Sequence, residues 1–203
     1  MITRRQVLTG SAGFAALTLA GPVWALDEDA ALAHVNASID DIVSLMADGG
    51  DADQISARLL GVMEERLALP SVARFVLGRA WRDLSDQQQT RFTQALAGSV
   101  ARSYARQFSE FKVEEQKVRQ TIFVERAVDA GRKGILVETQ IRPPGFPVVD
   151  MDYLVSDRPG KVAIVDVVIE GVSMAVTQRD IVGGMLNRRG GDVEKLIADL
   201  DAL

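Results

Sequence analysis

The hydrophobic periodicity of this chain changes near Phe111, and this change constrains the fold more than any other feature. Before that point apolar residues recur every three or four positions, as in amphipathic helices, and beyond it the spacing shifts towards two, as in strands. The pattern predicts helices over 26–47, 51–69, 72–82 and 85–108, and strands over 113–128 (bent or interrupted), 135–141, 148–156 and 162–169. Helices followed by closely connected strands indicate an α+β domain, with helices packed on one face of an antiparallel sheet of about four strands.

The clearest strand is the apolar, β-branched run at 162–169. Such a run is typical of a strand that is covered on both sides along much of its length. It ends at Glu170-Gly171, and Ser173 is predicted to cap a helix that continues to Leu186. A last short helix is expected over 192–203. Ser85 and Gln88 carry the capping-box pattern that opens the long helix at 85–108.

Composition narrows the function classes. The chain has 203 residues, of which 47% are hydrophobic, with no cysteine and a single histidine. It is long enough for one domain with a substantial core. The absence of cysteine excludes disulfides, thiolate catalysis and thiolate metal sites. A net charge of −5 without a long basic run makes nucleic acid an improbable partner.

Residues 1–25 have the three parts of an export signal. Arg4-Arg5 form the charged start, residues 7–20 form the apolar middle, and Gly21-Pro22 precede a predicted cleavage site after Ala25. The two arginines resemble a twin-arginine signal, and an ordinary secretory signal is the alternative. Either route takes the mature domain, residues 26–203, across the inner membrane, so the expected location is the periplasm.

The sequence offers few groups for catalysis. Gly171-Val172-Ser173-Met174-Ala175 imitates a nucleophile elbow, but a hydrolase needs a histidine base. His34 is the single histidine of the chain, and it is expected to be a surface or capping residue. Asp150, Asp152 and Asp166 lie in predicted strands, where hydrogen-bonded structural acids are commoner than a catalytic pair. We therefore expect no enzyme, no catalytic residue and no metal site.

Two sequence blocks carry a family resemblance. Val165 to Met174 reads V-D-V-V-I-E-G-V-S-M with Arg179 shortly after it, and Ala73 to Arg82 reads A-R-F-V-L-G-R-A-W-R. Both resemble the toluene-tolerance or MlaC family of periplasmic phospholipid-binding shuttle proteins. The sequence differs from the family pattern at Val162, where tryptophan is usual, and at Thr177-Gln178, where Asn-Tyr is common. The resemblance extends over residues 30–203.

The resemblance implies an NTF2-like fold whose helices and curved sheet enclose an internal apolar lipid cavity. It also implies a carrier that exchanges phospholipid between an outer-membrane lipoprotein complex and an inner-membrane ABC transporter with an MCE-domain protein, and so maintains outer-membrane lipid asymmetry. No cofactor is expected beyond the bound phospholipid. The alternatives are a carrier of a hopanoid or another polycyclic lipid, an NTF2-like enzyme acting on a small apolar substrate, and an adaptor with a filled core.

Inward-facing positions on the long helix, the sheet and the two blocks are the candidate lipid-binding residues. Arg74, Arg79 and Arg82 in the block at 73–82 are expected to pair with nearby acids, with a lipid phosphate as the alternative partner of one of them. The candidate lining consists of Phe75, Val76, Phe92, Leu96, Val100, Tyr104, Ile135, Val137, Met151, Tyr153, Val165, Val167, Ile169, Val172, Met174 and Ile181.

Overall fold

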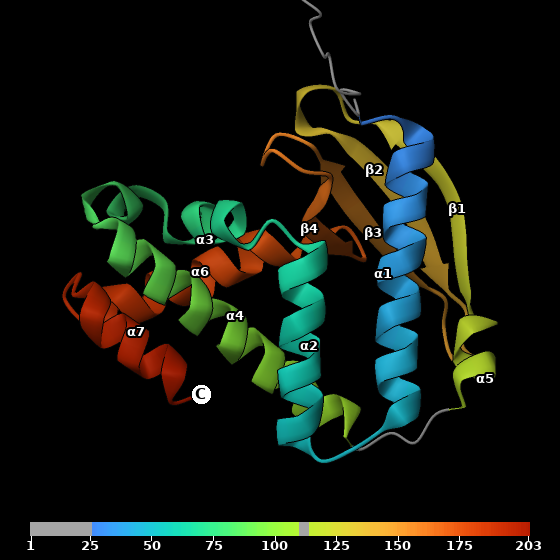
Figure 1. The fold of residues 1–203 in the computed structure, drawn as a ribbon, viewed down its shortest axis with the longest axis horizontal. Coiled ribbons are helices and arrows are strands. Elements are labelled where there is room, and N and C mark those ends of the chain that lie inside the picture. Colours follow the sequence, from blue (N-terminus) through green and yellow to red (C-terminus); the bar gives the residue numbers. More distant parts are fainter. Residues whose placement is uncertain (1–25, 110–113) are drawn as a thin grey trace, which may run out of the picture.

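Helices come first in the chain, a sheet follows, and two helices close it (Figure 1). The computed structural model describes residues 26–109 and 114–203, so the predicted export signal lies outside the described residues. The helices are α1 (Glu28–Asp48), α2 (Ala52–Arg66), α3 (Leu69–Leu77), the 3-10 helix η1 (Gly78–Asp83), α4 (Asp86–Phe108), α5 (Glu115–Arg119), the 3-10 helix η2 (Gly131–Lys133), α6 (Met174–Arg188) and α7 (Val193–Asp201). The strands are β1 (Ile122–Asp129), β2 (Ile135–Ile141), β3 (Val149–Ser156), β4 (Ala163–Ile169) and β5 (Val172–Ser173).

Side-chain caps fix where several helices begin. Ser85 accepts a hydrogen bond from the backbone N–H of Gln88, whose side chain bonds back to Ser85, so the predicted capping box of α4 is confirmed. The Ser173 hydroxyl accepts from the backbone N–H of Val176, which confirms the predicted cap of α6. Asp51 and Gln54 form a second capping box at α2. These contacts satisfy backbone donors that have no partner inside the helix.

The strands form one antiparallel sheet in the order β1-β2-β3-β4-β5. Pairing shifts between Val124 and Arg126 and between Leu154 and Val155. Such bulges bend a strand and increase its twist, and the sheet is accordingly curved. The four predicted strands are present, and the fifth is the two-residue β5, which follows a tight turn at Glu170 and Gly171.

Three predicted elements have bounds that differ from the structure by three residues or more. The helix predicted over 51–69 ends at Arg66, and Leu69 already belongs to α3. The strand predicted over 113–128 is divided, because 115–119 form the helix α5 and the strand β1 begins only at Ile122. The helix predicted over 72–82 begins earlier, at Leu69, and changes to a 3-10 helix at Gly78. Gly78 has a φ of +65°, a left-handed conformation that an α-helix cannot accommodate.

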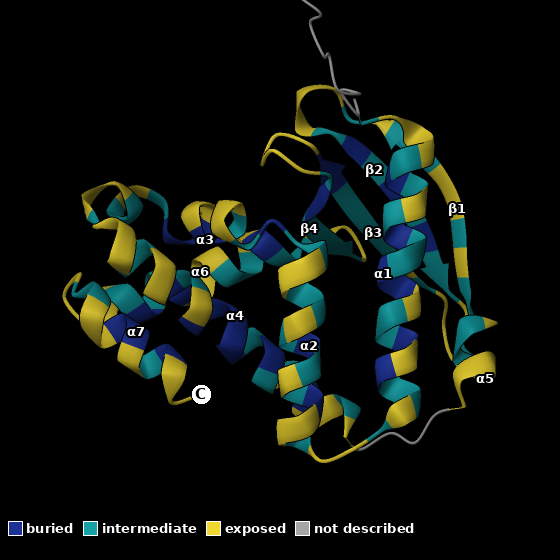
Figure 2. Ribbon diagram, viewed as in Figure 1, coloured by how far each residue is buried: buried dark blue, intermediate teal, exposed yellow. Residues whose placement is uncertain are grey.

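The buried apolar side chains form three separate clusters. Helix α1 lies along the sheet, whereas α3, α4, α6 and α7 form a second group beside it (Figure 1). Figure 2 shows buried residues in the middle of α4 and on the face of β2 behind α1. The sheet cluster contains Ala31, Val35, Ile39, Val43, Ile135, Val137, Val155 and Ile164. The helical cluster includes Ala73, Val76, Phe92, Leu96, Val182, Met185, Leu196 and Leu200. The α2–α4 cluster contains Leu45, Ile55, Leu59, Ala101 and Ala105.

Candidate functional site

The three clusters remain distinct, although a domain of this size usually has one contiguous core with small satellites. Close helix–sheet contacts join α1 to β1 and β2, and join α3 and α6 to β4, while α2 and α4 pack chiefly on each other. Leu67 and Ala68, just after α2, pair with Ile164 of β4, so the end of α2 meets the sheet there. The region between the clusters is the candidate site.

Apolar side chains at the margins of the clusters keep part of their surface accessible. We call this set the interior lining. It consists of Ile42, Met46, Met63, Tyr104 and Met174 from the helices, and Met151, Tyr153 and Val167 from the sheet. Apolar groups that stay accessible between packed clusters form a surface that an apolar ligand can cover.

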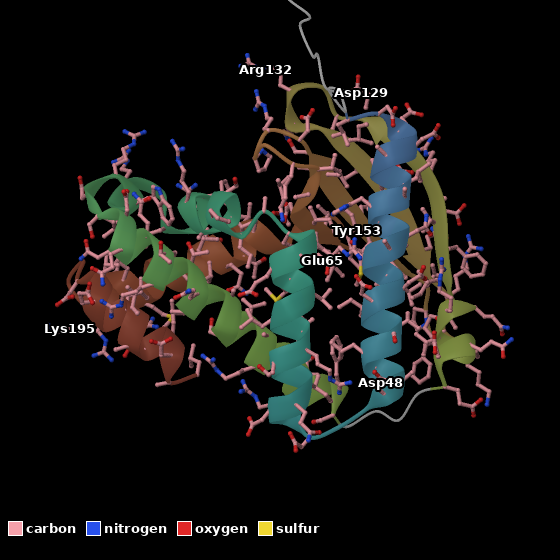
Figure 3. All side chains as sticks on the ribbon, in the orientation of Figure 1. Asp48, Glu65, Asp129, Arg132, Tyr153 and Lys195 are labelled. Carbon is pink, nitrogen blue, oxygen red and sulfur yellow. The ribbon has the colours of Figure 1, made fainter. Side chains whose placement is uncertain are left out.

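Strand register explains how the sheet contributes to the lining. Val137 pairs with Tyr153, and Tyr153 pairs with Val167, so the three lie in one row across β2, β3 and β4. Val137 is fully buried in the sheet cluster beneath α1. Tyr153 and Val167 lie further along the same row and are only partly buried. In Figure 3, Tyr153 appears between the ribbons of α1 and α2.

Both tyrosines of the chain belong to the interior lining. The Tyr153 hydroxyl lies 3.2 Å from the sulfur of Met151, and the Tyr104 hydroxyl lies 4.0 Å from the sulfur of Met174. Thioether sulfur is only a weak acceptor. Burial raises the pKa of Tyr153 to about 12, so its phenol is neutral over the whole physiological range.

Methionine is the commonest residue type in the lining. Met46, Met63, Met151 and Met174 are four of the six methionines in the chain. An unbranched, polarizable side chain with three rotatable bonds fits irregular apolar shapes. The lining therefore suits a flexible apolar ligand better than a rigid polar one.

The predicted lining residues fall into three groups. Val76, Phe92, Leu96, Ile135 and Val137 are buried in the packed clusters. Val100, Tyr104, Met151, Tyr153, Val165, Val167, Ile169 and Met174 are half-buried, and several of them form the interior lining. Phe75, Val172 and Ile181 are 41%, 54% and 50% exposed, so the structure places them on the outer surface.

Each of these three residues lies on an exposed side of its helix or strand. Phe75 lies on the outer side of α3, where the Arg179 guanidinium lies 5.1 Å from the centre of its ring. Helix α6 buries Val182 and Met185, and Ile181 lies on its exposed side. Val172 belongs to the short edge strand β5. Arg74, Arg79 and Arg82, which were expected to pair with acids, form no ion pair with the described residues.

The lining residues on α1 and α2, namely Ile42, Met46 and Met63, were missed by sequence reasoning, although a signal was present in α1. In α1, Val35, Ile39 and Val43 recur every four residues and pack on the sheet. Ile42 and Met46 form a second four-residue series, which packs against the α2–α4 cluster. Two offset series on one helix indicate that it is covered on two sides.

An open pocket of about 540 Å³ adjoins this region at the surface. It lies where the α2–α3 junction, α4 and the β3–β4 turn meet, and Leu67, Ala97 and Lys161 are among its residues. Leu67 also packs against the sheet cluster. The pocket's residues include none of the interior lining, and the pocket meets the sheet cluster through Leu67.

The nucleophile-elbow sequence has a structural role. The Ser173 hydroxyl donates to Asp166 Oδ2 at 2.5 Å, and the backbone N–H of Ala175 donates to Asp166 Oδ1 at 2.9 Å. His34 Nε2 lies 2.9 Å from the backbone carbonyl of Arg66, which joins α1 to the end of α2. Ser173 and His34 are thus engaged in separate structural contacts.

The other strand acids also have structural partners. Asp152 Oδ1 accepts from the backbone N–H of Thr139 at 3.2 Å, and burial raises the pKa of Asp152. Asp150 accepts from Gln140 at 2.9 Å. In residues 26–109 and 114–203, no group of three or more His, Cys, Asp or Glu side chains is arranged to hold a metal ion. Among the described helices, none has the length and apolarity that a membrane span requires.

Comparisons with known proteins agree with the architecture. The family model described as "MlaC protein" matches residues 35–202. The fold is similar to the solved structure of the phospholipid-binding protein from Ralstonia solanacearum in complex with a phospholipid. That match has a TM-score of 0.70 and 20% sequence identity, and covers 85% of this chain and 95% of that chain. No curated protein matches the chain.

Proposed function

Since this chain belongs to the MlaC family, we propose that it is a phospholipid carrier that holds acyl chains against the interior lining. The observation that carries the proposal is the division of the core into three clusters with accessible apolar, methionine-rich margins between them. The phospholipid complex of the structural neighbour supports the same assignment. The structural engagement of Ser173 and His34 supports a binding protein rather than an enzyme.

The energetics of acyl burial favour a carrier that needs help to release its cargo. Each methylene removed from water contributes about 0.8 kcal/mol. A lipid with roughly 30 methylenes would gain more than the ~20 kcal/mol at which non-covalent affinities saturate. Ordering of the chains, and the lipid's preference for the membrane it leaves, offset much of this gain. Spontaneous release is then slow, so lipid transfer requires a partner that opens the site.

The cellular setting is part of the same proposal. An export signal in residues 1–25 would deliver the domain to the periplasm. There it would receive and deliver phospholipid at an outer-membrane lipoprotein complex and at an inner-membrane ABC transporter with an MCE-domain protein, and would maintain outer-membrane lipid asymmetry. Family membership supports these partners, and the slow release expected from acyl burial explains why they are needed.

Mass spectrometry of the protein purified without detergent tests the binding proposal. We expect a solvent extract to contain about one glycerophospholipid per chain. A polycyclic lipid in that extract would show that the cargo is not a phospholipid, while the carrier function would still be supported. A stable, lipid-free protein that takes up nothing from phospholipid vesicles would contradict the carrier proposal and favour an adaptor with a filled core.

Cell fractionation tests the location and the export route. We expect the protein in the periplasmic fraction, shortened near Ala25. Replacing Arg4 and Arg5 together by lysine keeps the charge and removes the twin-arginine feature. Accumulation of the uncleaved double variant in the cytoplasm identifies twin-arginine export, whereas normal processing identifies the ordinary secretory route. Full-length wild-type protein in the cytoplasm would contradict export.

A further inference from the structure

Two hydroxyl groups on the concave face of the sheet lack a good hydrogen-bond partner. Thr139 is 1% exposed, and its Oγ1 has no partner among the described residues. Within residues 26–109 and 114–203, the Tyr153 hydroxyl has no hydrogen-bond partner except the sulfur of Met151, at 3.2 Å. Buried hydroxyls normally find a nitrogen or oxygen partner, because leaving them unpaired is costly. Both groups therefore point to a polar atom that is supplied from outside the chain.

Strand register brings these groups together. Thr139 lies two residues after Val137 on β2, so both face α1, and Val137 pairs with Tyr153 on β3. The same register places Met151 opposite Thr139. Asp152 Oδ1 takes the backbone N–H of Thr139, which leaves this part of the β2–β3 ladder without its regular bonds. Thr139, Met151 and Tyr153 thus form one small polar spot within the otherwise apolar lining.

Met151 explains how a ligand could reach this spot. Its side chain starts opposite Thr139, and its sulfur lies against the Tyr153 hydroxyl. It occupies the position that an acceptor oxygen would take. A methionine can withdraw by rotating three single bonds without moving the backbone.

We propose that the Thr139 and Tyr153 hydroxyls donate hydrogen bonds to an ester carbonyl of the bound lipid. A carbonyl oxygen has two lone pairs and accepts from two donors, whereas a hydrocarbon chain or an ether oxygen satisfies such donors poorly or not at all. Because burial raises the pKa of Tyr153 to about 12, its phenol keeps the proton that it donates. The inference rests on the proposed lipid-carrier function and adds selection of acyl-ester lipids over ether-linked ones.

Competition between two matched lipids tests this selection. The purified protein is incubated with vesicles that contain equal amounts of a diacyl phosphatidylglycerol and its dialkyl ether analogue of the same chain length. Native mass spectrometry then gives the ratio of the two bound lipids. We expect the wild type to prefer the diacyl lipid roughly fivefold, the factor that corresponds to one hydrogen bond of ordinary net strength.

Three variants locate the selectivity. Tyr153→Phe and Thr139→Val each remove one hydroxyl with little change in shape, and each is expected to move the ratio towards one with total bound lipid retained. Thr90→Val is the matched control, since it removes a threonine hydroxyl that donates to the backbone carbonyl of Asp86 on the exposed side of α4, away from the interior lining, and leaves the ratio at the wild-type value. Circular dichroism confirms that each variant is folded.

Separate outcomes distinguish failure of this inference from failure of the carrier function. Full loading of the wild type with no preference, or an unchanged preference in Tyr153→Phe and Thr139→Val, would overturn ester recognition and leave the carrier intact. An equal loss of preference in Thr90→Val would overturn the assignment to this pair. A wild type that takes up neither lipid would overturn both proposals.

Discussion

Asp166 on β4 and Ser173 at the start of α6 are joined by a 2.5 Å hydrogen bond, in which the serine hydroxyl donates to the carboxylate. The same hydroxyl accepts from the backbone N–H of Val176, and the other oxygen of Asp166 accepts from the N–H of Ala175. The carboxylate therefore fixes both the cap and the first turn of α6. This link anchors the helical group to the edge of the sheet.

Replacing Ser173 by alanine tests this structural role. The change removes the cap and one partner of Asp166, so the free energy of unfolding should fall by about 1–2 kcal/mol. Urea unfolding measures the loss, and bound lipid per folded chain should stay unchanged. Unaltered stability together with loss of an esterase activity would instead identify Ser173 as a nucleophile.

Tryptophan at two positions separates the interior lining from the packed core. Val167 is half-buried in the lining, whereas Leu96 is buried in the helical cluster. Val167→Trp should displace lipid with little change in melting temperature, because the ring can occupy volume that the lipid vacates. Leu96→Trp should overpack the core and lower stability by about 1–3 kcal/mol, with lipid retained in the folded fraction. The reverse pattern would mean that the site has been placed on the wrong side of α4.

Alkaline unfolding tests the burial of Tyr153. Its pKa is raised to about 12 in the folded protein, against about 10 in the unfolded chain. The unfolded chain therefore loses its proton first, so this group's stabilising contribution is complete below about pH 10 and is lost as the pH rises to about 12. The contribution is at most about 2–3 kcal/mol.

The measurement compares urea unfolding of the wild type and Tyr153→Phe between about pH 9 and about pH 12. We expect the wild type to lose stability relative to Tyr153→Phe as the pH rises, because only the wild type carries a phenol that the unfolded chain ionises first. A constant difference over the whole interval would mean that Tyr153 is solvated.

Two glycine-to-alanine changes should have opposite effects. Gly78 lies between α3 and η1 at a φ of +65°, with Arg179 Nη2 3.4 Å from the position of an added Cβ. Gly78→Ala should therefore lower stability by about 1 kcal/mol. Gly61 lies within α2 and has open space around it. Gly61→Ala should raise stability by roughly 0.5–1 kcal/mol, because alanine favours the helix. Equal effects of the two changes on thermal unfolding would contradict this account.

Local signals predicted the elements well. The caps predicted at Ser85 and Ser173 depend only on hydrogen bonds between residues three positions apart, and both caps are present. Period-two spacing located β2 and β4 to within a residue. The prediction for the segment before β1 was wrong. Residues 115–119 form the short helix α5 instead of a strand, and none of these residues is buried.

The site could be predicted only in part, because periodicity shows that a helix has an apolar side without showing what covers it. Phe75 and Val76 are neighbours on α3, yet Val76 is 2% exposed and Phe75 is 41% exposed. Their difference depends on where α6 lies, which no local pattern encodes. Thr139 was missed for a related reason, since its significance depends on its position opposite Met151 across two strands.

The separation of the sheet cluster from the helical cluster has a mechanical consequence. The two groups meet where α3 and α6 pack on β4 and where Leu67 and Ala68 pair with Ile164, and we infer that the spacing away from these contacts can change while each group stays packed. The Asp166–Ser173 hydrogen bond would then be a fixed point between the two groups. The methionine side chains of the lining would change rotamer to follow the change in spacing. Such a protein can swell around a longer or more branched cargo and contract when it is emptied, and its internal volume becomes a property of what it carries.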